Sequence, residues 1–86
     1  MRRSELHAMK ILDTFGAAYG LDIVKASGSA IRRGGVYVML GRLEERGLVS
    51  SVQETNTPDH IGIPRRIYSL TDLGRKEIAR EPLRSE

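Results

Sequence analysis

The 86-residue sequence contains no cysteine and no tryptophan, and its aromatic residues are limited to one phenylalanine and three tyrosines. Without cysteine, the chain has neither a disulfide framework nor a thiolate-ligated zinc site, and a reducing compartment suits it. It also lacks an apolar run near the roughly 20 residues that a membrane-spanning helix needs. The N-terminus, MRRSELHAMK, carries charges where a signal peptide would be apolar. We therefore expect a cytoplasmic protein with no membrane partner.

Residue combinations typical of enzymes and metal sites are missing as well. His7 and His60 are far apart in sequence, and the pair Asp59-His60 falls in a stretch of turn-forming residues. The sequence shows no phosphate-binding glycine motif, no nucleophile paired with a base and no metal-ligand spacing. We therefore expect no enzymatic activity, no cofactor and no bound metal.

Positive charge is present and unevenly distributed. The net charge is only +3, but residues 32–46 contain four arginines against two glutamates, and Arg65 and Arg66 are adjacent. Clustered arginines are typical of surfaces that bind nucleic acids, although a solvated surface with no partner is the simpler alternative.

The N-terminal half of the chain is expected to form two helices. Ser4 can cap a first helix over about residues 4–17. The core stripe of that helix consists of apolar residues three and four apart: Ala8, Ile11, Leu12 and Phe15. Leu6 and Met9 fall outside the stripe, so they either form a second apolar edge for a partner chain or are ordinary exposed residues. A short second helix is expected over about residues 20–27, before the turn SGS.

A third helix is predicted over about residues 33–46. Its core stripe is Val36, Leu40 and Leu43, and Gly47 stands where a left-handed residue would end the helix. Gly34 and Gly35 at its start either expose backbone N–H groups suited to a phosphate or only make a tight turn.

The C-terminal half is expected to form a β-hairpin and one more helix. Two strands within residues 48–70 flank the turn-rich stretch 54–62, and alternation places Arg65 and Arg66 on opposite faces. Thr71 can cap a fourth helix over about residues 71–80, with Gly74 and Ile78 facing the core. The order of three helices, two strands and a helix predicts a single α+β domain of residues 1–86 with the winged helix-turn-helix fold.

Two blocks of sequence resemble a known family of such proteins. The block GGVYVMLGRLEERGLV is similar to the recognition helix of the PadR family. Its matching positions are Gly35, Tyr37, Leu40, Arg42, Leu43, Glu44, Gly47, Leu48 and Val49. The block PRRIYSLTDLGR resembles that family's wing strand and the turn after it. Its matching positions are Arg65, Arg66, Tyr68, Leu70, Thr71 and Gly74. GLDIV at 20–24 resembles the second-helix motif, with Leu21 where a tyrosine is usual.

The resemblance covers about residues 4–80 and implies a bacterial or phage-type transcriptional regulator that is nucleoid-associated when bound to DNA. It also implies dimers that bind palindromic operators through contacts of the first helix and a long C-terminal helix. Pro82 and the end of the sequence at Glu86 depart from that pattern. Either the chain does not form a dimer, or a homodimer uses the first and fourth helices, with Leu6 and Met9 as its candidate face.

The function expected on these grounds is sequence-specific binding of double-stranded DNA by a transcriptional regulator, a repressor by our interpretation. The third helix would enter the major groove and the hairpin would act as the wing. The candidate DNA-binding residues are Arg32, Arg33, Gly34, Gly35, Val38, Met39, Arg42, Arg65 and Arg66, with Tyr37 as a candidate phosphate contact. The alternative is a winged-helix protein-interaction module, or an anti-repressor, that does not bind DNA.

Overall fold

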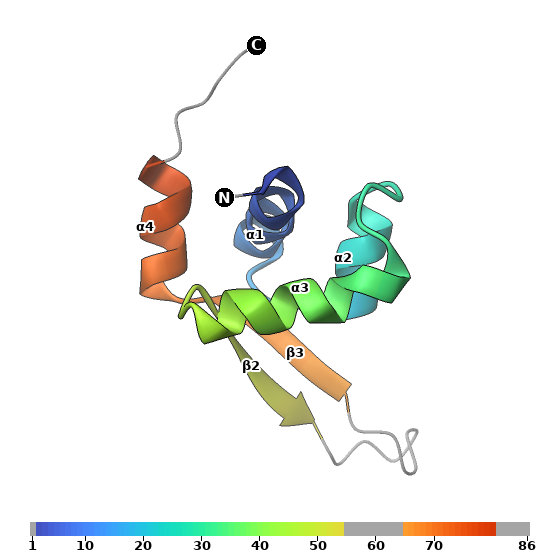
Figure 1. The fold of residues 1–86 in the computed structure, drawn as a ribbon. Coiled ribbons are helices and arrows are strands. Elements are labelled where there is room, and N and C mark those ends of the chain that lie inside the picture. Colours follow the sequence, from blue (N-terminus) through green and yellow to red (C-terminus); the bar gives the residue numbers. More distant parts are fainter. Residues whose placement is uncertain (1, 55–64, 81–86) are drawn as a thin grey trace.

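The computed structural model of the protein describes residues 2–54 and 65–80. Its elements, in chain order, are α1 (Arg3–Phe15), β1 (Ala18–Tyr19), α2 (Gly20–Ala26), α3 (Arg33–Glu45), β2 (Val49–Glu54), β3 (Arg65–Leu70) and α4 (Asp72–Arg80). The predicted α+β class and winged-helix order are confirmed (Figure 1). Most of the expected turn-rich stretch, with Asp59 and His60, and the segment around Pro82 lie outside the described residues.

The sheet has one strand more than the sequence predicted. The antiparallel order is β1-β3-β2, with Ala18 opposite Tyr68 and Val49 opposite Leu70. Strand β1 is two residues long, too short for any alternation of polar and apolar side chains to reveal it. Its pairing ties the connection between α1 and α2 to the wing strand β3.

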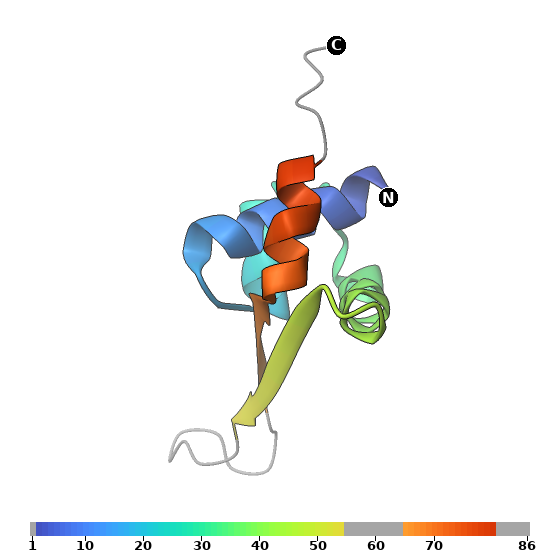
Figure 2. The same ribbon diagram turned by 90° about the vertical axis from the view of Figure 1, so that its left-hand side faces the viewer.

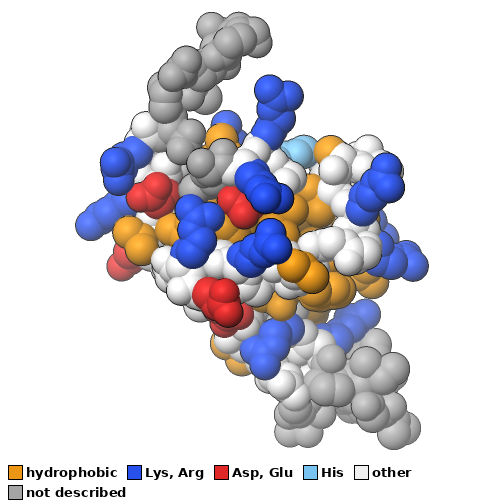
Figure 3. Space-filling model, in the orientation of Figure 1, with side chains coloured by type: hydrophobic (Ala, Val, Ile, Leu, Met, Phe, Trp, Pro, Cys, Tyr) orange, Lys and Arg blue, Asp and Glu red, His pale blue; other side chains and the backbone are white. Residues whose placement is uncertain are grey.

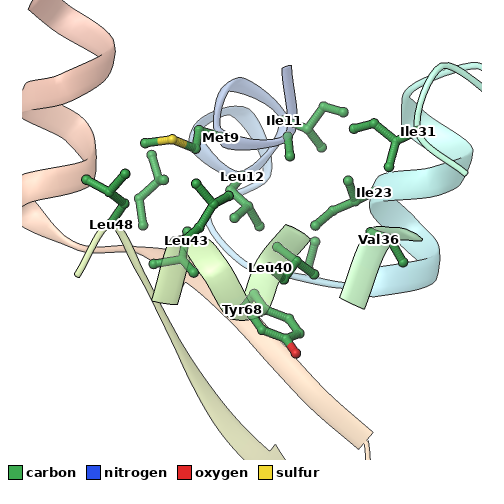
Figure 4. Close-up of a cluster of buried hydrophobic side chains, with 14 residues drawn as sticks. Met9, Ile11, Leu12, Ile23, Ile31, Val36, Leu40, Leu43, Leu48 and Tyr68 are labelled. Atoms are coloured by element: carbon green, nitrogen blue, oxygen red, sulfur yellow. The ribbon is translucent and has the colours of Figure 1, made fainter. Parts of the chain in front are cut away.

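The core lies between the three N-terminal helices and the start of the hairpin (Figure 4). The predicted stripe of α3 is confirmed, because Val36, Leu40 and Leu43 are all 0% exposed. Ile23 from α2 and Leu12 from α1 complete the centre of this cluster. Burying each such side chain contributes about 1.5–3 kcal/mol, so this cluster fixes α3 against the other two helices.

Helix α1 departs from its predicted pattern at three positions. Met9 is 0% exposed and extends toward Leu48 in Figure 4, so it belongs to the core and not to an exposed partner-binding edge. Its burial follows from the contact of α1 with α4, which widens the buried side of the helix. Phe15, predicted in the core, is the last residue of the helix and is half-exposed. Ser4 does not cap the helix, which begins at Arg3. The backbone N–H of Arg2 instead donates to Glu5 Oε1 (3.3 Å).

The end of α3 and the start of α4 meet in direct backbone contact. Gly47 has the predicted positive φ of 78°, and the N–H of Leu48 donates to the Leu43 carbonyl at 2.9 Å, as in a Schellman motif. Thr71 caps α4 as predicted: its hydroxyl accepts the Gly74 N–H (3.0 Å) and donates to the Gly47 carbonyl (2.6 Å). The N–H of Thr71 donates to the Leu48 carbonyl (3.1 Å).

Gly74 is required by this close approach. A Cβ at that position would lie 2.1 Å from the Leu48 carbonyl oxygen, which is backbone and cannot swing away. The predicted core-facing positions of α4 are confirmed, since Gly74 is buried and Ile78 packs against the core.

We expect Gly74→Ala to lower the free energy of unfolding by about 2 kcal/mol, because the methyl group forces the two segments apart. Gly41→Ala is the matched control, since a Cβ there meets nothing within 4 Å. That change should raise stability by about 0.5–1 kcal/mol through helix propensity alone. Urea denaturation followed by circular dichroism measures both. A Gly74→Ala variant as stable as the wild type would contradict the backbone contact.

Candidate nucleic-acid interface

The face of α3 opposite its buried stripe is open to solvent. Arg33, Val38 and Arg42 on this helix are all exposed, and Val38 is 58% exposed although it is a branched apolar residue. Figure 3 shows that lysine and arginine side chains prevail over acidic ones on the face that carries α3. An uncovered helix with arginines and an apolar side chain between them has the groups that read base edges: guanidinium donors and a contact for the thymine methyl.

Gly34 and Gly35 leave the backbone exposed at the start of α3, as expected, but one of their two N–H groups is already hydrogen-bonded. A Cβ at Gly34 or Gly35 would meet nothing within 4 Å, so no packing contact requires glycine there. The Gly35 N–H is already used, because it donates to the Arg32 carbonyl at 3.1 Å. The idea that both glycine N–H groups are free is therefore wrong for Gly35. Arg32 itself is exposed just before the helix.

Met39 lies differently from the other nominated residues of α3. It is half-buried and packs against the hydrophobic core, so only part of its side chain is available to a ligand. It nevertheless borders a groove of about 320 Å³ between the start of α1 and α3, which Arg2, Val38 and Arg42 also line.

Tyr37 stands at the edge of the exposed face, about half-exposed, with its ring against the backbone of Gly20 in α2. A Cβ at Gly20 would lie 2.6 Å from Cε1 of the Tyr37 ring and 3.0 Å from its hydroxyl oxygen. The missing side chain at Gly20 thus makes room for the ring at the junction of α2 and α3.

Arg66 lies on the side of the sheet that faces α3. Its guanidinium donates to Ser51 Oγ (2.9 Å) and Gln53 Oε1 (3.3 Å), and Ser51 in turn donates to Glu44 Oε2 (2.8 Å). These bonds connect the base of the wing to the C-terminal half of α3. Tyr68, on the same side, is buried; this burial raises the pKa of its phenol, and the Glu44 carboxylate raises it further.

Arg65 lies on the other side of β3, as strand alternation predicted. Its guanidinium sits 4.9 Å from the centre of the Tyr19 ring, and the Tyr19 hydroxyl donates to Glu54. That hydrogen bond raises the pKa of the Tyr19 phenol, burial and the Glu54 charge add to the rise, and Arg65 opposes it. The aromatic contact orients Arg65 while leaving it exposed.

One ion pair joins the end of α3 to the start of α1, and the sequence pattern did not predict it. Glu5 is 7% exposed and its Oε1 accepts from Arg46 Nη1 at 3.2 Å, across 41 positions of the chain. Arg46 is at the end of α3 and Glu5 is in the first turn of α1. Neither residue stands in a local pattern that would reveal so distant a partner.

Removing Arg46 should leave the buried Glu5 carboxylate with the Arg2 N–H as its one hydrogen-bond partner among the described residues. We expect Arg46→Ala to cost about 1–2 kcal/mol of folding free energy, a value reduced because Arg46 is half-exposed. Arg75→Ala is the control, because its partner Asp72 is fully exposed and such pairs contribute about 0–1 kcal/mol. Thermal and urea unfolding compare the two. Equal effects would mean that the Glu5 pair is no stronger than a surface pair.

The arrangement of three helices, an exposed third helix and an adjoining hairpin defines a winged helix-turn-helix protein. A family model described as "Transcriptional regulator PadR-like family" matches residues 6–80. The chain therefore belongs to the PadR-like family of transcriptional regulators, as the two sequence blocks indicated. A comparison with curated proteins gave no significant match.

Solved structures of similar fold agree with this assignment. A PadR family transcription regulator from Clostridium difficile is 23% identical, with a TM-score of 0.74 over 91% of this chain and 81% of that one. A PadR-like transcription factor from Bacteroides fragilis is 29% identical, with a TM-score of 0.73 over 87% and 72% of the two chains. Bacillus subtilis PadR, solved with operator DNA, is 20% identical, with a TM-score of 0.78 over 100% of this chain and 52% of its own.

No helix among residues 2–54 and 65–80 is long and apolar enough to cross a lipid bilayer. The same residues contain no group of three histidine, cysteine, aspartate or glutamate side chains placed to hold a metal ion.

Proposed function

We propose that this protein binds double-stranded operator DNA and acts as a transcriptional repressor. The observation that carries the proposal is the uncovered face of α3, where Arg33, Val38 and Arg42 are exposed opposite a fully buried stripe. The B. subtilis relative of the same fold has been solved with operator DNA. Repression is the simplest outcome, because a protein seated on a promoter excludes the polymerase.

In the proposed complex, α3 enters the major groove from its N-terminal half. Arg33 and Arg42 would donate to guanine O6 and N7 or to phosphates, and Val38 would contact a thymine methyl. Arg32 and the Gly34 backbone would meet phosphate at the positive end of the helix dipole. Gly35 would let the DNA backbone approach closely, and Met39 would contribute at most an edge contact.

The wing is proposed to contact the sugar-phosphate backbone through Arg65 and Arg66. Their positions on opposite sides of β3 make each one suited to a different strand segment. Arg66 is tied to Ser51 and Gln53, so a phosphate contact from Arg66 must share or exchange those hydrogen bonds. Such contacts orient the protein on the duplex without reading its sequence.

We also propose that two copies bind a palindromic operator as a homodimer paired through α1 and α4. Met9 is not part of that face, since it is 0% exposed. Apolar surface on these helices remains at half-buried Leu6 and at exposed Leu73. Paired half-sites one helical turn apart would match the two-fold symmetry of such a dimer.

Fluorescence anisotropy of a labelled duplex tests the DNA-binding proposal. On mixed-sequence DNA at low salt the wild type should bind, and its affinity should fall steeply as salt rises because phosphate contacts release counterions. On a site enriched by selection, Arg33→Ala and Arg42→Ala should each cost about 1–3 kcal/mol. Arg75→Ala is the control: it removes the same side chain from the side of α4 opposite Leu73, away from the proposed dimer face, and should change little.

Absence of binding at low salt would contradict the proposal, since even non-specific attraction is strongest there. A winged helix that binds a partner protein would then be the better interpretation.

A further inference from the structure

The guanidinium of Arg66 is held by two side chains of the neighbouring strand β2. Its Nη1 donates to Ser51 Oγ at 2.9 Å, and its Nη2 donates to Gln53 Oε1 at 3.3 Å. Gln53 stands directly opposite Arg66 in the register of β2 and β3, and Ser51 lies two positions earlier on the same side of β2. The two bonds therefore fix both arms of the fork at the end of a long, flexible side chain.

The direction of each bond at Ser51 follows from the chemistry of its partners. The Ser51 hydroxyl must accept from Arg66, because an arginine side chain can only donate. Its single proton goes to Glu44 Oε2 at 2.8 Å, because an ionised carboxylate can only accept. With that proton held by Glu44, the lone pairs of the Ser51 oxygen are left for the guanidinium. Each bond polarises the other, so the two charged ends strengthen the chain between them.

This chain of hydrogen bonds connects the recognition helix to the wing. Figure 2 shows α3 nearly end-on beside the start of β2, with the hairpin extending away from the helices. Glu44 lies on α3 two positions after Arg42 of the proposed recognition face, and Arg66 is the second residue of β3. The Arg66 guanidinium is therefore fixed relative to α3 as well as to its own sheet.

The internal bonds leave Arg66 able to bind a further group. A guanidinium has five N–H donors, and the bonds to Ser51 and Gln53 use two of them. The other donors are open to phosphate oxygens, since the Arg66 side chain is exposed. A phosphate contact can thus form while both internal bonds persist.

We propose that Ser51 is a positioning residue for DNA binding: with its proton held by Glu44, it holds the Arg66 guanidinium where the wing meets a backbone phosphate. This inference rests on the proposed function and gives Ser51 itself no contact with DNA. An arginine that is already ordered loses less conformational freedom on binding, so its contact is stronger than that of an unrestrained surface arginine. Because phosphates are the same in every sequence, the gain in affinity does not depend on the operator.

The test compares the duplex affinity of Ser51→Ala with that of the wild type by fluorescence anisotropy. Loss of one hydrogen bond to the guanidinium should weaken binding roughly 2- to 10-fold. The factor should be the same on random and on selected duplexes. The slope of log K against log salt should not change, because the arginine still reaches its phosphate. Ser51→Thr keeps the hydroxyl in a side chain suited to strands and should bind as the wild type does.

Ser50→Ala is the matched control. It makes the same change one position earlier, on the opposite side of the sheet, where the Ser50 hydroxyl faces that of Ser69. This variant should keep the wild-type affinity.

The decisive comparison repeats Ser51→Ala in a protein that also carries Arg66→Ala. A residue that acts through Arg66 has no further effect in that background. A hydroxyl that only stabilised the hairpin would weaken binding equally in both backgrounds.

The inference is overturned if Ser51→Ala keeps the wild-type affinity while Arg66→Ala weakens binding, or if its effect is the same with and without Arg66. In either case the protein binds DNA as proposed, but Ser51 does not position the wing. Full affinity of Arg66→Ala would also overturn it, while the α3 contacts would still stand if Arg33→Ala and Arg42→Ala weaken binding. A wild type that fails to bind any duplex at low salt overturns this inference and the proposed function together.

Discussion

The wing projects as it does because two distant segments meet in backbone contact where α3 ends and α4 begins. The Gly47 carbonyl accepts the Thr71 hydroxyl, the Leu48 carbonyl accepts the Thr71 N–H, and Gly74 leaves room for that same carbonyl. Strand β2 leaves this junction one residue after Leu48, and β3 enters it at Leu70. The hairpin's angle to α3 is thus set by hydrogen bonds and close packing. The Ser51–Glu44 bond adds a second support further along the strand.

Much of the fold could be predicted because local chemistry and tertiary packing agree. The stripe of α3, the left-handed Gly47 and the Thr71 cap are all local signals, and each is present in the structure. Strand β1 was not predicted because two residues are too few to show a periodicity. The strand exists only through its pairing with β3, some fifty positions later in the chain. Met9 and Phe15 were misassigned because the buried width of α1 depends on α4 and on where the helix stops, which its own spacing does not encode.

The candidate site likewise contains residues that the sequence could nominate and contacts that only the structure shows. The exposure of Arg33, Val38 and Arg42 follows from helical geometry once the buried stripe is known, so periodicity sufficed to nominate them. The opposite sides taken by Arg65 and Arg66 follow from strand alternation. The Glu5–Arg46 ion pair and the Tyr19–Arg65 contact each join residues from different elements. No pattern along the chain records such pairs, because they exist only after α1 has packed on α3 and the sheet has formed.

The central claim is that α3 and the base of the wing contact the same duplex. The most direct measurement is an amide chemical-shift titration by NMR, to which a 9.6 kDa chain is well suited. Addition of duplex DNA should shift resonances of α3 from Arg33 to Arg42 and of the Arg65–Arg66 strand start, while Arg75, on the side of α4 opposite Leu73, stays unchanged. Shifts confined to α1 and α4, or no shifts at low salt, would contradict the account.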